Sequence, residues 1–82
     1  MLTDKQEMRN LAANLRIAML ERGWSQLDLE RASGVRQPRI SGILTVKHEP
    51  SVCVVSRLAK ALSRSIDNLL SPPPQKKMRR AS

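Results

Sequence analysis

The sequence predicts a small all-α domain, and three observations support this. Apolar residues recur at helical spacing along almost the whole chain, and few stretches alternate in the manner of a β-strand. The 82 residues give room for one compact domain. Serine or aspartate precedes the apolar segments, and glycine follows two of them, as is typical of helix starts and ends. We therefore expect one compact domain of five helices over residues 1–70.

The first predicted helix begins near the N-terminus and ends at Arg22. Thr3 or Asp4 can cap its start, and Glu7 stands close to the reach-back position of a capping box. Gly23 is expected to end the helix, because glycine takes the left-handed conformation easily. The residues expected on its inner face are Leu11, Leu15 and Ala18.

The second and third predicted helices are short and are joined by a tight turn. Ser25 is a good N-cap for the second, with Asp28 three residues further on, and Gly34 ends it. The third helix runs from about Gln37 to Leu44, with a proline in its first turn, where a missing N–H is tolerated. The residues expected to face inward are Leu29, Ala32 or Ser33, Val35, Ile40 and Ile43. Such a pair serves to project one helix outward.

Two further helices complete the domain. Ser51 can cap the fourth after a polar loop at 47–50, and Ser65 begins a minimal fifth helix. The apolar positions of the fourth are Val54, Val55, Leu58, Ala61 and Leu62. Three prolines after Ser71 favour extended structure, and little beyond them can be buried. We expect residues 71–82 to form a disordered, proline-rich basic tail.

The net charge of +8 points to a polyanionic partner. Half of this charge lies in residues 1–70 and half in residues 71–82. Proteins that bind single strands or RNA usually stack bases on aromatic rings, and Trp24 is the one aromatic residue here. That tryptophan is expected to pack between the first two helices. Duplex DNA is therefore the favoured partner.

Several other classes of protein are excluded. Cys53 and His48 are each the single residue of their type, so neither a disulfide framework nor a zinc site is expected. No apolar run exceeds four residues, which argues against a membrane span or a signal peptide and predicts a cytoplasmic, nucleoid-associated protein. No nucleotide-binding loop or nucleophile motif is present, so we expect no enzyme activity and no cofactor.

The third predicted helix has one apolar side and one polar side. At 100° per residue, its apolar side comprises Ile40, Ile43 and Leu44. The residues of the outer face are Pro38, Ser41, Gly42 and Thr45, with Gln37 and Arg39 at its edges. A short polar face suits a helix that enters the DNA major groove, where a glutamine can pair with adenine through two hydrogen bonds.

These residues resemble the Cro/repressor, or XRE, family of helix-turn-helix proteins over about residues 11–70. The matching segments are Ser25-Gln26, Gly34-Val35, Gln37-Pro38-Arg39-Ile40-Ser41, Pro50-Ser51-Val52, Leu58-Ala59-Lys60-Ala61-Leu62 and Ser65-Ile66-Asp67-Asn68-Leu69-Leu70. The resemblance implies a lambda-repressor-like fold. It also implies a phage or bacterial transcriptional repressor that binds a two-fold symmetric operator as a homodimer.

The resemblance assigns roles to two glutamines. In phage repressors of this family, a glutamine that opens the second helix pairs with one that opens the third. This implies phosphate contact and support by Gln26, and base reading by Gln37. The full set of predicted DNA-binding residues is Gln26, Arg36, Gln37, Pro38, Arg39, Ser41, Gly42, Thr45, Lys47 and His48.

Four residues depart from the family pattern. Glu30 replaces a small alanine where the two helices cross, so either the crossing is wider or Glu30 turns outward to meet an arginine such as Arg36. Val46 and Ser63 replace loop glycines, and since neither takes positive φ easily, we expect turns of a different shape. Gly42 lies inside the third predicted helix, where glycine lowers helix stability by about 1 kcal/mol relative to alanine. We interpret the choice of glycine there as a sign that DNA approaches closely.

Alternatives to a repressor remain open, and so does the choice of residues that form the dimer surface. With the same fold, the protein could control a restriction–modification operon, or be an antitoxin that also binds a toxin. A different class is a non-specific nucleoid or RNA-binding protein driven by the tail. The apolar residues available for a dimer surface are Ile17 and Leu20, or Leu69 and Leu70, and we favour the second pair.

Overall fold

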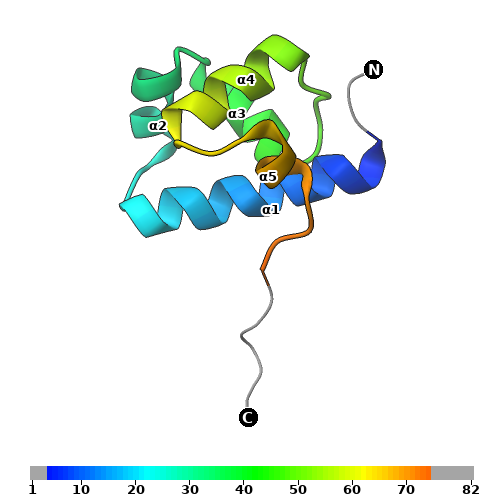
Figure 1. Ribbon diagram of the computed structural model, residues 1–82. Helices are drawn as coiled ribbons and strands as arrows, with labels where there is room; N and C mark the ends of the chain where they lie inside the picture. The colour runs from blue at the N-terminus through cyan, green and yellow to red at the C-terminus, as the bar shows by residue number, and fades with distance from the viewer. Residues whose placement is uncertain (1–3, 75–82) are drawn as a thin grey trace.

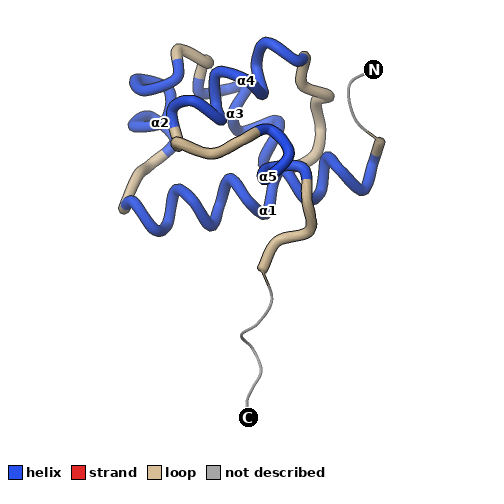
Figure 2. Tube along the Cα trace, in the orientation of Figure 1, coloured by secondary structure: helices blue, strands red, loops and turns tan. Residues whose placement is uncertain are grey.

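The computed structural model describes residues 4–74, and all regular structure in that range is helical (Figures 1 and 2). The helices are α1 (Lys5–Arg22), α2 (Gln26–Ser33), α3 (Gln37–Leu44), α4 (Val52–Ala61) and α5 (Ile66–Leu70). Figure 1 shows α1 along one side of the molecule, with the other helices packed on it or above it. This confirms the predicted all-α fold. Thr3 and the part of the predicted tail from residue 75 onward lie outside the described residues.

The helices start and end where the local sequence signals predicted. Asp4 caps α1 in a capping box with Glu7, whose backbone N–H donates to Asp4 Oδ1 at 2.7 Å. Gly23 and Gly34 end α1 and α2 in the left-handed conformation, with φ of 68° and 81°. The helices α4 and α5 are capped by serine hydroxyls at the expected positions, Ser51 and Ser65.

The capping box of α2 contains a carboxyl group with a lowered pKa, that of Asp28. The Ser25 backbone N–H donates to Asp28 Oδ2 at 2.8 Å, and this hydrogen bond lowers the pKa of Asp28. A lowered pKa in the folded state means that the carboxylate stabilises the fold above its unfolded pKa, and that this contribution is lost as the pH falls through the folded pKa. The cap is therefore ionised at neutral pH.

The core lies where the five helices meet. Its fully buried side chains are Leu11, Leu15, Leu29, Ile40, Ile43, Val55, Leu58, Leu62 and Leu69. Of the two alternatives in α2, Ser33 is half-buried and Ala32 is exposed. Trp24 is half-buried against this core, as expected, and the Arg22 guanidinium lies 5.0 Å from the centre of its ring. Among the described helices, none is long and apolar enough to cross a membrane.

The turns at Val46 and Ser63 keep the left-handed conformation that glycine would take. Their φ angles are 58° and 56°, so the expectation of turns with a different shape is wrong. A residue other than glycine in the left-handed conformation costs only about 1–2 kcal/mol of conformational energy. Packing of the helices that flank each turn outweighs this cost. The Val46 N–H also donates to Ile43 O, and the Ser63 N–H to Lys60 O.

Polar side chains of α1 bind the C-terminal carbonyl groups of three other helices. Asn10 donates to Leu70 O at 2.9 Å, and the Asn14 amide lies 2.7–3.2 Å from three carbonyl oxygens around the end of α5. The remaining two donors are Arg16, to Leu44 O at the end of α3, and Arg22, to Leu62 O after α4. Because the last carbonyls of a helix have no partner within it, these contacts satisfy groups that burial would otherwise leave unpaired.

The position of α5 removes one of the two leucines from the favoured dimer surface. Leu69 is 0% exposed, and Leu70 is half-buried against the core. The two asparagines of α1 hold α5 so that Leu69 lies inside the core, and the prediction that Leu69 forms a partner surface is wrong. The other pair differs, since Leu20 is 82% exposed and Ile17 is half-buried.

We predict that Asn14→Asp lowers the free energy of unfolding by about 1–3 kcal/mol at neutral pH. The substitution keeps the size of the side chain but exchanges two N–H donors for a carboxylate that faces carbonyl oxygens. Urea unfolding of the variant and the wild type measures the loss. The matched control is Asn68→Asp, an exposed position on α5, which should change stability far less. Equal losses at the two sites would contradict the capping role of Asn14.

Candidate nucleic-acid interface

The helix α3 presents a polar face to solvent, as the sequence predicted. Its inner residues Ile40, Ile43 and Leu44 are buried in the core. On the outer side, the exposed residues are Pro38, Arg39 and Thr45, and the half-buried ones are Gln37 and Ser41. Because α3 packs against both α1 and α2, its outer face is held in one orientation.

The two glutamines of the helix pair are hydrogen-bonded to each other. Gln37 Nε2 donates to Gln26 Oε1 at 2.7 Å. This contact uses one N–H of the Gln37 amide and leaves its second N–H and its carbonyl oxygen in a fixed orientation. A donor and an acceptor side by side are what the major-groove edge of adenine requires. The geometry therefore suits base reading by Gln37, with Gln26 as its support.

The side chain of Glu30, a residue of α2, reaches the start of α3. One carboxylate oxygen of this residue, Oε1, accepts a hydrogen bond from the Gln37 backbone N–H at 2.7 Å. The expectation that Glu30 turns outward to an arginine such as Arg36 is wrong: within residues 4–74, the ion pairs are Asp28–Arg31 and Glu21–Arg64. Arg36, the N-cap of α3, makes no side-chain cap, so Glu30 supplies one from the neighbouring helix.

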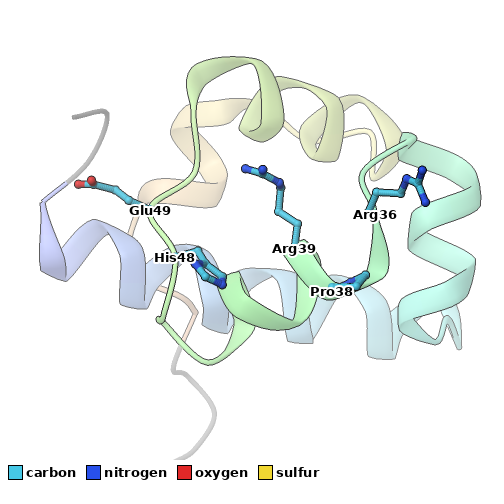
Figure 3. Close-up of a pocket in the computed structure, with 5 residues that line it drawn as sticks. All are labelled: Arg36, Pro38, Arg39, His48 and Glu49. Carbon is cyan, nitrogen blue, oxygen red and sulfur yellow. The ribbon is translucent and has the colours of Figure 1, made fainter.

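Basic side chains surround a shallow pocket beside α3. The pocket has a volume of about 440 Å³ and is lined by Arg36, Pro38, Arg39, His48 and Glu49. Figure 3 shows Arg36 and Pro38 at the start of α3, Arg39 on its first turn and His48 beyond its C-terminal end. The Glu49 carboxylate points away from the basic side chains in this view. Two guanidinium groups on an exposed surface of this size form a suitable place for backbone phosphates.

Gly42 is buried, which corrects its expected place on the exposed face. A Cβ atom at Gly42 would lie 1.9 Å from the Cδ2 atom of His48, so the imidazole ring rests directly on the glycine. The loop is closed further by the Lys47 and His48 N–H groups, which both donate to Gly42 O. The structure thus supplies an intramolecular reason for glycine at this position, and His48 is the residue that faces outward.

The remaining predicted residues lie at the C-terminal end of α3. Thr45 is exposed, and its hydroxyl donates to Ser41 O at 3.0 Å, which leaves its oxygen able to accept a further hydrogen bond. Lys47 is exposed in the following loop. Together with His48, these residues extend the polar surface beyond the helix itself.

Sequence reasoning did not foresee two contributions to this region. One is the cap by Glu30, a residue that the sequence singled out for another reason, because this role depends on where the start of α3 lies. The other is Arg57 of α4, whose Nη1 atom lies 3.4 Å from the place that a Cβ would take on Gly34, at the turn between α2 and α3. Arg57 adds a positive charge next to the helix pair. Its place there results from the packing of α4 on α2, for which the sequence carries no local signal.

Comparisons with known proteins agree with this geometry. The family model described as helix-turn-helix matches residues 15–69. The chain is 30% identical over 76 residues to a hypothetical transcription factor of Neisseria meningitidis serogroup B, an alignment that covers 92% of this chain and 72% of that protein.

A solved structure is similar as well. The crystal structure of the hypothetical transcription factor NHTF from Neisseria superposes with a TM-score of 0.79 at 28% identity, covering 93% of this chain and 88% of that one. The family match spans all of α2 to α4 and so includes both glutamines of the hydrogen-bonded pair. The chain therefore belongs to the helix-turn-helix family of the Cro/repressor, or XRE, type.

Proposed function

We propose that this protein is a transcriptional regulator that binds duplex DNA sequence-specifically, and that it represses by occupying an operator and blocking polymerase. The observation that carries the proposal is the Gln26–Gln37 hydrogen bond on the exposed polar face of α3. The family membership supports it, as do the similar sequence and the similar crystal structure from Neisseria, each described as that of a hypothetical transcription factor.

In this proposal α3 enters the major groove and Gln37 reads a base. Its free N–H and carbonyl oxygen pair with an adenine, while Gln26 fixes the amide and contacts a phosphate. Arg36 and Arg39, which both line the pocket beside α3, bind phosphates next to the groove. Lys47 and His48 contact the backbone at the other end of the helix.

We propose further that the protein binds as a homodimer. One short recognition helix brings only about 3–4 side chains to base edges, which is too little to specify a unique genomic site. Two copies related by a two-fold axis read a symmetric operator with twice that information. Of the two apolar pairs considered for the dimer surface, the pair on α1 includes Leu20, which is 82% exposed, whereas Leu69 of the other pair is 0% exposed.

Base reading by Gln37 is tested by truncating its side chain. Gln37→Ala should weaken binding to the preferred operator by about 1–3 kcal/mol and binding to random duplex much less, because only the operator offers the matching base. Fluorescence anisotropy titrations on both duplexes measure this. Gln6→Ala, the same change on the exposed start of α1, is the matched control and should change neither affinity. Equal losses of Gln37→Ala on both duplexes would make Gln37 a phosphate contact.

The two-fold arrangement is tested by the spacing of the half-sites. Half-sites should lie about 10–10.5 base pairs apart, centre to centre, so that both recognition helices meet one face of the DNA. Inserting five base pairs between them should reduce affinity to that of a single half-site, because the two grooves then face opposite sides. Sedimentation should show two chains on the intact operator. A one-to-one complex, or full affinity for one half-site, would contradict the dimer.

A further inference from the structure

Every backbone N–H group in the first turn of α3 is either absent or engaged. The Gln37 N–H donates to Glu30 Oε1 at 2.7 Å. Pro38 has no N–H, and the Arg39 N–H donates to Arg36 O at 3.0 Å. A helix start normally offers free N–H groups and a partial positive charge to an anion such as a DNA phosphate. Here the carboxylate of Glu30 already occupies that place.

Glu30 and Gln26 together hold Gln37 at two points. They stand four residues apart on α2 and so lie on the same face of that helix. Gln26 binds the side-chain amide of Gln37, and Glu30 binds its backbone N–H, each at 2.7 Å. Both the backbone and the amide of Gln37 are thus fixed relative to α2 before any ligand arrives.

We propose that Glu30 is a positioning residue that raises the sequence specificity of this protein. The inference rests on the proposed function, in which Gln37 reads a base. Glu30 acts in two ways, of which only the first changes specificity: it fixes the residue that reads the base, and its negative charge disfavours a DNA phosphate at the first backbone N–H groups of α3. The first effect strengthens binding to the correct sequence. The second weakens binding to every sequence alike and so leaves the ratio of operator to scrambled affinity unchanged, since phosphate contacts carry no sequence information.

Two variants of Glu30 separate these effects. Glu30→Ala removes both the acceptor and the charge, while Glu30→Gln keeps an acceptor oxygen and removes only the charge. Asp67→Asn on α5 is the control, because it makes the same change in net charge at an exposed position on another helix. Affinities are measured on the selected operator and on a scrambled duplex of equal length, with circular dichroism to confirm that each variant is folded.

We expect Glu30→Ala to bind the scrambled duplex at least as tightly as the wild type does, and to lose about fivefold or more on the operator, the size of a lost helix cap. Glu30→Gln should keep the wild-type ratio of operator to scrambled affinity within about twofold. Asp67→Asn should also leave that ratio unchanged. A ratio unaltered by Glu30→Ala, or lowered equally by Glu30→Gln, would overturn the proposal.

A measurement without DNA tests the contact itself. The backbone amide hydrogen of Gln37 should exchange with solvent about tenfold faster in Glu30→Ala than in the wild type or Glu30→Gln. The reason is that this N–H loses the Glu30 carboxylate as its acceptor. Equal exchange rates would overturn the role of Glu30. A wild-type protein that binds both duplexes equally would contradict the proposed function, and with it the specificity role, while the exchange rates would still report whether the cap exists.

Discussion

The whole arrangement depends on fixing an eight-residue helix from outside. A helix as short as α3 does not persist alone in water, because nucleation costs more than two turns of hydrogen bonds return. Its underside is held by Ile40, Ile43 and Leu44 in the core. At its C-terminal end Arg16 donates to Leu44 O at 3.0 Å, and at its start Glu30 accepts from Gln37. The neighbours of α3 therefore supply the rigidity that a recognition helix needs.

The polar side chains of α1 extend the same principle to the rest of the fold. Through Asn10, Asn14, Arg16 and Arg22, one long helix binds carbonyl groups at the ends of α3, α4 and α5. Apolar packing alone tolerates small shifts of one helix along another, whereas a buried hydrogen bond has one acceptable geometry. These contacts give the helices defined positions as well as stability, and they place the polar face of α3 on the surface.

The sequence predicts best the features that depend on neighbours along the chain. Capping boxes, the glycines after α1 and α2, and the apolar side of α3 all follow from spacings of a few residues, and all are found. Contacts across long separations were missed or mistaken. The sequence predicts either a wider helix crossing at Glu30 or an outward turn to an arginine, whereas Glu30 caps α3; it also predicts that Gly42 faces DNA, whereas Gly42 lies under His48. Val46 and Ser63 take left-handed conformations that their local preferences disfavour, because tertiary packing overrides those preferences.

Selection of bound duplexes from a pool of random DNA tests whether α3 reads the sequence, since it measures specificity and symmetry without assuming an operator. If two copies of α3 read the sequence, the selection enriches one consensus with two half-sites, related by two-fold symmetry and about one helical turn apart. We also expect an adenine in each half-site to lose its enrichment when the selection is repeated with Gln37→Ala. A pool that remains random, or a consensus that Gln37→Ala leaves intact, would contradict α3 as the helix that reads the sequence.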